Sequence, residues 1–282
     1  MKAAALEIDH VTIAGSDLSE LNECFSSLGM ATDYGGPHSN GITHMSLLGL
    51  PDGSYAELIA TLRPHQFSPW WHEHIEGNGG PCGWAIEVPD VNAESQRVAG
   101  LGIAVRGPQH MTRVRPDGRM IEWDMAVLGD GGPGTKLPFI IRDRTPRSYR
   151  VSPSATFARG PLTGIAAVVL GVNDMDVSVA LFRRLYALPE PSMETNISFG
   201  AHLAWFTDTP VVLAAPLQPD HWLAERLSRF GECPCAYLFS TGRFEEAEQV
   251  LELADSHEWF GRTVGWFDLG RSHGFHLGVD AD

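Results

Sequence analysis

The chain has 282 residues, of which 43% are hydrophobic and 20% charged, and its formal net charge is −15. This composition is typical of a soluble globular protein and excludes extensive disorder. The negative charge argues against a nucleic-acid backbone or an anionic membrane as the main partner. The longest apolar run is too short to span a bilayer, and the N-terminus lacks a signal-peptide pattern, so we expect a cytoplasmic protein.

The first predicted strand covers residues 8–14. Its apolar Val11 and Ile13 alternate with polar His10 and a threonine, so the two sets face opposite sides of a sheet. The Gly-Ser-Asp that follows is typical of a turn and a helix cap, and it predicts a helix over residues 18–28. The pattern places His10 on one face of an early strand, where it can point into a cavity.

Three more strands complete a unit of strand, helix, strand, strand and strand, and weaker copies of this βαβββ unit follow. In the first unit the later strands are predicted at 31–34, 42–48 and 54–61. The second unit has strands at 84–88, 103–105, 112–114 and 119–127 and a helix at 92–99. The C-terminal units have strands at 164–172, 202–206, 211–215, 236–240, 263–269 and 275–279 and helices at 177–186, 221–230 and 244–254. The fold class is therefore predicted to be α+β, with four units in two pairs.

Two Pro-Asp-Gly turns in the first half are each followed by a glutamate at the same distance. Glu57 lies four residues after Gly53 (57 − 53), and Glu122 lies four residues after Gly118 (122 − 118). This spacing indicates that the two glutamates occupy equivalent places on the last strand of their units.

A segment rich in Gly, Pro and Arg separates the two pairs of units, so we predict domains at 1–130 and 161–282 with a linker at 131–160. The apolar island at 137–141 is expected to pair with a sheet edge. The linker arginines are expected to pair with acidic side chains of the neighbouring modules, the alternative being that they bind an acidic ligand.

The four units, the Asp-His-Val-Thr-Ile opening and the Pro-Asp-Gly turns before a glutamate resemble the vicinal oxygen chelate superfamily. This superfamily includes glyoxalase I, extradiol dioxygenases and the fosfomycin and bleomycin resistance proteins. Within it, segments 35–38, 42–44, 55–58 and 137–141 are similar to the glyoxalase-like domain family. The resemblance implies that each pair of modules curls into a half-open barrel.

Metal ligands in this superfamily come from the first and last strands of the modules. The resemblance therefore implies that His10, Glu57 and Glu122 bind a divalent Fe, Zn, Mn or Ni ion, with Glu122 also acting as the catalytic proton shuttle. The matching position on the first strand of the second unit is Gly83, which cannot ligate. The matching positions of the C-terminal pair are apolar or glycine, so we expect that pair to have a structural or substrate-covering role.

Four more side chains are candidates for contact with a substrate: His38, His44, Trp84 and Trp123. His44 is alternatively a fourth metal ligand or a hydrogen-bond partner of one. The tryptophans are expected to line an apolar pocket for a ring-containing substrate, or else to belong to the core.

Two functional hypotheses follow. The first is a metal-dependent isomerase, lyase or ring-cleaving dioxygenase that acts on a small molecule with vicinal oxygens. A dioxygenase needs two histidines and a carboxylate around Fe²⁺, so it requires His44 beside His10. The second hypothesis, which Gly83 favours, is a metal-free protein that binds and sequesters a small molecule, like the bleomycin resistance group. Superfamily members build the barrel within one chain or across two chains, so the sequence is compatible with either a monomer or a homodimer.

Overall fold

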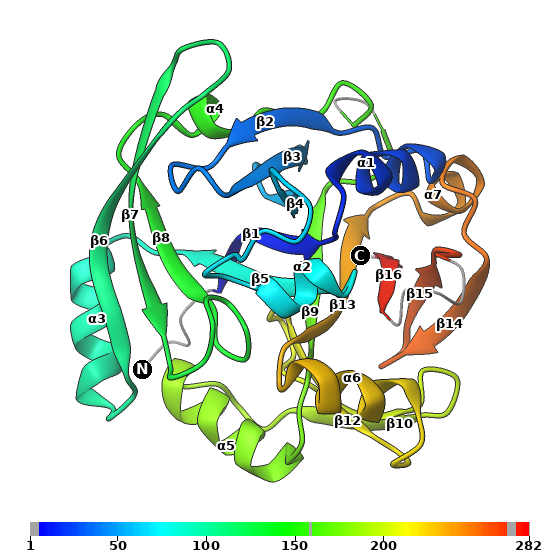
Figure 1. Cartoon of the computed structure of the whole chain (residues 1–282). Coiled ribbons are helices and arrows are strands. Elements are labelled where there is room, and N and C mark those ends of the chain that lie inside the picture. Colours follow the sequence, from blue (N-terminus) through cyan, green and yellow to red (C-terminus); the bar gives the residue numbers. More distant parts are fainter. Residues whose placement is uncertain (1–5, 158–159, 270–274, 282) are drawn as a thin grey trace.

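The computed structural model describes residues 6–157, 160–269 and 275–281, and it contains two curled eight-stranded sheets with interspersed helices (Figure 1). In each sheet two βαβββ units meet through their first strands. The strand order is β2-β3-β4-β1-β5-β8-β7-β6 in the first sheet and β10-β11-β12-β9-β13-β16-β15-β14 in the second. The predicted α+β class with paired half-barrels is confirmed.

The first sheet consists of β1 (Glu7–Ala14), β2 (Asp33–Pro37), β3 (Thr43–Gly49), β4 (Tyr55–Thr61), β5 (Gly80–Glu87), β6 (Val105–Val114), β7 (Met120–Leu128) and β8 (Phe139–Asp143). The second consists of β9 (Gly164–Gly171), β10 (Ser192–Asn196), β11 (Ala201–Trp205), β12 (Val211–Pro216), β13 (Pro234–Thr241), β14 (Asp255–Trp259), β15 (Arg262–Trp266) and β16 (His276–Ala281). The helices are α1 (Leu18–Ser27), α2 (His72–Glu76), α3 (Val91–Gly100), α4 (Arg147–Arg150), α5 (Met175–Tyr186), α6 (Trp222–Phe230) and α7 (Phe244–Val250). Among the described residues, no helix has the length and apolar character needed to cross a membrane.

The second unit differs from its prediction in two strands. The two short strands expected at 103–105 and 112–114 form one strand, β6, because a register shift between Arg106 and Gln109 absorbs the Gly-Pro between them. The apolar island does not pair with an edge, since it forms β8 in the interior of the sheet, between β5 and β7. The first sheet therefore extends to Asp143, 13 residues beyond the boundary expected at 130 (143 − 130).

The two sheets share one hydrophobic core, which β1, β5, β9 and β13 cross in the middle of the molecule (Figure 1). Val11 and Ile13 of β1 point into this core, which also contains apolar side chains of the second sheet such as Val168 and Phe239. Because strand side chains alternate, His10 faces the opposite, inner side of the first sheet. The alternation visible in the sequence thus decides which residues can form a site.

A buried tyrosine of the second sheet fixes β1 and β5. The Tyr237 hydroxyl lies 3.0 Å from the carbonyl oxygen of Thr12 and 2.8 Å from that of Gly83. The pairing of β1 with β5 shifts register between Thr12 and Ile13, so backbone groups there need a partner outside the ladder. The hydroxyl supplies that partner from the C-terminal half.

We expect Tyr237→Phe to lower the free energy of unfolding by about 1–3 kcal/mol, because a buried carbonyl then loses its hydrogen bond. Urea denaturation measures this change. The matched control is Tyr34→Phe, since Tyr34 is 53% exposed. Equal midpoints for the two variants would show that the Tyr237 hydroxyl contributes nothing to stability.

Candidate functional site

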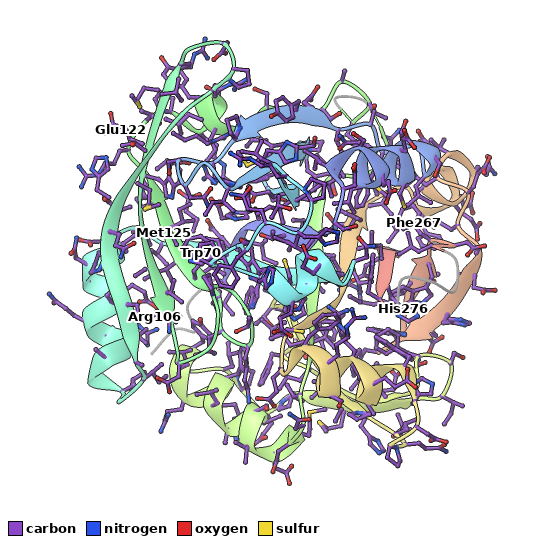
Figure 2. All side chains as sticks on the ribbon, viewed as in Figure 1. Trp70, Arg106, Glu122, Met125, Phe267 and His276 are labelled. Carbon is purple, nitrogen blue, oxygen red and sulfur yellow. The ribbon has the colours of Figure 1, made fainter. Side chains whose placement is uncertain are left out.

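The inner face of the first sheet encloses a cavity of about 230 Å³. Aromatic rings and methionines make up much of its wall, and Figure 2 shows Trp70 and Met125 inside the curl of the sheet. The main polar side chains in the wall are His10, His38, Tyr55, Glu57, Arg113 and Arg150. An apolar cavity with a few convergent polar groups is the usual form of a small-molecule site.

His10 is oriented by the residue before it. Its Nδ1 lies 2.5 Å from the Oδ1 atom of Asp9, and its ring stacks on Tyr55 with centroids 4.7 Å apart. Nε2 has no hydrogen-bond partner among the described residues. A carboxylate beside Nδ1 favours the tautomer that carries its proton there, which leaves the lone pair on Nε2. His10 therefore presents a basic nitrogen in the cavity wall.

Asp9 is ionised although it is fully buried. Arg150 donates to both of its carboxylate oxygens at 2.7 Å, and Arg147 donates to Oδ2. Burial alone raises the pKa of Asp9, but Arg150 and His10 outweigh it and hold the pKa well below its usual range. These contacts confirm that the linker arginines pair with acidic side chains.

Glu57 of β4 faces the same cavity. The His38 Nε2 atom lies 3.5 Å from its Oε1 atom, and His38 Nδ1 lies 2.8 Å from the hydroxyl of Thr43. Burial raises the pKa of Glu57, but His38, His10 and Arg113 together lower it to about 2. Glu57 is therefore a carboxylate at neutral pH, within reach of a ligand's hydroxyl.

The structure does not bring Glu122 to this cavity. On β7 it is Trp123, the next residue, that lines the cavity, so Glu122 lies on the opposite face of the strand (Figure 2). Its carboxylate lies 3.0 Å from His110 Nε2, and both side chains are 40% exposed. The expectation that Glu122 joins His10 and Glu57 is thus corrected.

The order of the strands explains why Glu122 is not equivalent to Glu57. The first Pro-Asp-Gly turn joins β3 to β4, whereas the second joins β6 to β7, so the two turns are not equivalent. The last strand of the second unit is β8. Thr12 lies opposite Glu57, and Ala85 lies opposite Phe139. Thr12 and Ala85 each precede a helix-capping aspartate by five residues (17 − 12 and 90 − 85), so the counterpart of Glu57 is Phe139.

Only two of the four ligand positions in the first half therefore carry a donor, His10 and Glu57. The other two are Phe139 and Gly83, and a Cβ atom on Gly83 would lie 2.7 Å from the ring of Trp71. Among the described residues, no three His, Cys, Asp or Glu side chains are grouped so that they could hold a metal ion. This donor set does not fit the three-ligand metal site that the family resemblance implies.

Two other predicted substrate contacts point elsewhere. His44 lies between Thr43 and Met45, which line the cavity, so its ring faces away and meets the edge of Tyr34. Trp84 is completely buried in the core that the two sheets share. The structure therefore leaves His38 and Trp123 as the predicted substrate contacts that line the cavity.

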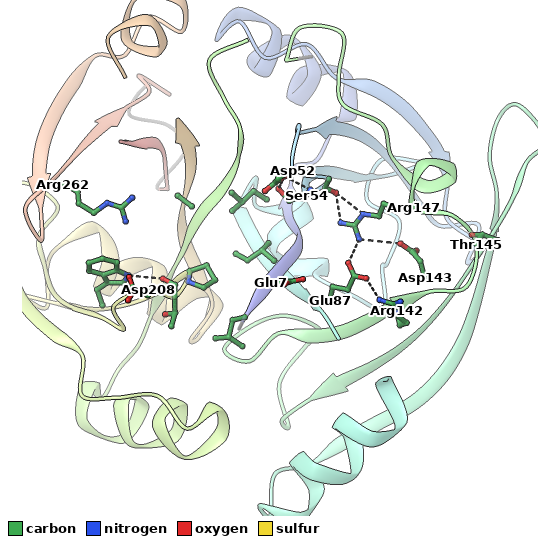
Figure 3. Close-up of a pocket in the computed structure, with 18 residues that line it drawn as sticks. Glu7, Asp52, Ser54, Glu87, Arg142, Asp143, Thr145, Arg147, Asp208 and Arg262 are labelled. Carbon is green, nitrogen blue, oxygen red and sulfur yellow. Dashed lines mark hydrogen bonds and ion pairs between the residues drawn. The ribbon is translucent and has the colours of Figure 1, made fainter. Parts of the chain in front are cut away.

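A wider cleft of about 810 Å³ lies between the two halves, and its charged side chains largely pair with one another (Figure 3). Arg142 binds Glu87 at 2.7 Å, and Arg147 lies 3.5 Å from Glu87 and 3.6 Å from Asp143. The inner cavity, where a basic imidazole and a carboxylate lie in an apolar wall, is the better candidate site.

The model of the family described as glyoxalase-like domain matches residues 8–186. The chain belongs to the glyoxalase-like domain family. No curated protein matches this glyoxalase-like chain. The matched region contains the first sheet apart from Glu7, and with it every residue that lines the cavity.

Solved structures share the fold of this glyoxalase-like protein at low identity. A hypothetical protein from Staphylococcus aureus has a TM-score of 0.65 at 12% identity, covering 99% of this chain and 100% of that one. A mutant of 4-hydroxymandelate synthase from Streptomyces coelicolor has a TM-score of 0.64 at 12% identity, covering 98% and 92%. A xylose isomerase-like TIM barrel/4-hydroxyphenylpyruvate dioxygenase fusion protein has a TM-score of 0.60 at 12% identity, covering 99% and 49%. These likenesses show the fold alone.

Proposed function

We propose that this glyoxalase-like protein is an enzyme that binds a small organic molecule with vicinal oxygens in the cavity of its first sheet and moves a proton on it, as isomerases and lyases do. The observation that carries the proposal is the Asp9–His10 pair. A buried, ionised carboxylate holds one ring nitrogen, and the other has no hydrogen-bond partner in the described part of the chain and lies in the wall of an apolar cavity.

In this proposal His10 Nε2 takes a proton from the carbon next to a carbonyl group of the substrate. The imidazolium that forms is stabilised by the negative charge of Asp9 at Nδ1. Glu57, which is also ionised, accepts a hydrogen bond from a substrate hydroxyl and so orients the molecule. The rings of Trp70, Trp71 and Trp123 supply an apolar wall against which the body of the substrate can pack.

Proton exchange with solvent tests the proposal, because exchange is visible whatever product the reaction forms. The protein is incubated in D₂O with a panel of small 2-hydroxy and 2-oxo carbonyl compounds, and the carbon-bound protons are followed by NMR. We expect catalysed deuterium incorporation or conversion for at least one compound that binds. Binding without exchange or conversion of any compound would contradict the proposal.

Whether His10 and Glu57 bind a metal ion is tested by the effect of metals on stability. If His10 and Glu57 held a catalytic ion, wild-type protein would gain about 2.7 kcal/mol at a metal concentration 100 times the dissociation constant, and both alanine variants would lose that gain. From the donor set we expect instead that Mn²⁺, Ni²⁺ or Zn²⁺ changes the unfolding midpoints of wild type, His10→Ala and Glu57→Ala equally. Metal analysis of protein purified without chelator is the second measurement. A stoichiometric ion that is lost in both variants would contradict this prediction.

The second candidate function is metal-free binding and sequestration of a small molecule. The incomplete ligand set at Gly83 and Phe139 and the apolar cavity wall favour it. In that case His10 and Glu57 form hydrogen bonds to the ligand. A compound that is bound tightly and recovered unchanged, with no proton exchange, would identify this function.

A further inference from the structure

Arg113 lines the cavity as a buried cation that forms no ion pair with any described carboxylate. It lies on β6, and its side chain is only 6% exposed. It donates a hydrogen bond from Nη1 to the carbonyl oxygen of Gly35, and among the described residues no carboxylate lies within 4.0 Å of its guanidinium. Nε and Nη2 have no partner in the described chain and are not sealed from solvent, so they are free to meet a ligand.

The other arginine in the cavity wall, Arg150, is paired with carboxylates. Arg150 binds Asp9 and Asp143, at 2.7 and 2.8 Å. A buried charge without an ion-pair partner is costly, so an anion bound in the cavity would stabilise Arg113. The charge of Glu57 favours the Arg113 cation, but Glu57 has its closest partner in His38 and forms no ion pair with Arg113 within 4.0 Å. The carboxylates that bind Arg150 are already paired with it.

We propose that Arg113 makes this cavity selective for anions, so that the bound molecule carries a carboxylate beside an aromatic body. The planar guanidinium matches the two oxygens of a carboxylate, and the aromatic wall of Trp70, Trp71, Trp123 and Phe139 matches a ring. A cavity of about 230 Å³ has room for one ring with its substituents. This inference rests on the proposed use of the cavity as a small-molecule site, and it adds the class of substrate.

Matched pairs of acids and amides test the inference by tryptophan fluorescence titration. Benzoate is compared with benzamide, and salicylate with salicylamide, at several salt concentrations. We expect wild-type protein to bind each acid at least about tenfold more tightly than its amide. Arg113→Met should abolish this preference. Arg106→Met is the control on the same strand, because Arg106 donates to the carbonyls of Asp130 and Gly131 and does not line the cavity.

Equal affinity of wild type for acids and amides would overturn the inference, and so would an unchanged preference in Arg113→Met. The absence of saturable binding of either acid up to about 10 mM would also overturn it. The wild-type comparison decides the question even if Arg113→Met does not fold. His10→Ala should keep the preference, so a failure of the catalytic proposal is distinguishable from a failure of this one.

Discussion

Replacing Asp9 with asparagine should lower the free energy of unfolding by about 3–5 kcal/mol. The substitution keeps the shape of the side chain but removes the negative charge that Arg150 and Arg147 share, and it leaves Arg150 buried with Asp143 as its one acidic partner. Breaking a buried ion pair by removing one partner costs this much because the other charge remains away from water. Urea denaturation of wild type and variant measures the difference.

The control for this variant is Asp124→Asn. Asp124 pairs with Arg144 at 2.8 Å on the surface, where solvent and salt screen the interaction, so the midpoint should hardly move. If Asp9→Asn were no more destabilising than Asp124→Asn, the buried network would not support β1 as we describe.

The same network predicts how stability changes in acid. The folded-state pKa of Asp9 is depressed below 3.8, and that of Glu57 is lowered from 4.5 to about 2. A carboxylate with a depressed pKa contributes stability that is present above its ordinary pKa and is lost as the pH falls through its folded pKa. The unfolding free energy of wild type should therefore fall steeply below about pH 4.5, and the fall should be shallower in Asp9→Asn and Glu57→Gln. Identical pH profiles for the three proteins would contradict the assignment.

The fold is predictable because its main signals are local. Alternation in β1 and β4 and the aspartate caps at Asp17 and Asp90 each fix a strand face or a helix start without reference to distant parts of the chain. The place of β8 is not predictable in this way. Its apolar residues fit an edge or an interior strand equally well, and only the pairing with β5 and β7 decides between them.

The expectation that Glu122 lies beside Glu57 is wrong because the last strand of the second unit is β8 and not β7. With residues 119–127 as the last strand of their unit, the Pro-Asp-Gly spacing makes Glu122 the counterpart of Glu57, although Phe139 holds that place. Arg113 escapes prediction for a different reason. It lies among polar and exposed residues of β6, and the curl of the sheet that buries it depends on contacts with distant strands. A lone arginine in such a strand has no local signal of function.

Replacing His10 with alanine should lower the rate of catalysed proton exchange by about 10²–10⁴-fold, which is the usual contribution of a general base. The affinity for the ligand should change far less, because the apolar wall and Arg113 remain. The measurement is the D₂O exchange rate, together with the dissociation constant from fluorescence titration, for the compound that the panel identifies. A rate loss that simply follows a loss of affinity would mean that His10 binds the ligand and does not act on the proton.

The control and a rescue experiment separate chemistry from structure. His110→Ala removes a surface imidazole that is 40% exposed and lies on the opposite face of β6 from Met111, which lines the cavity, so its exchange rate should match that of wild type. Added imidazole should restore part of the activity of His10→Ala, because the substitution opens space in the cavity wall where a free base can take the place of the ring. Asp9→Asn should not respond to imidazole, since its His10 ring still fills that space. A purely structural role for His10 would give no rescue in either variant, and it would leave the ionised Asp9 beside Nδ1 without a part in the reaction.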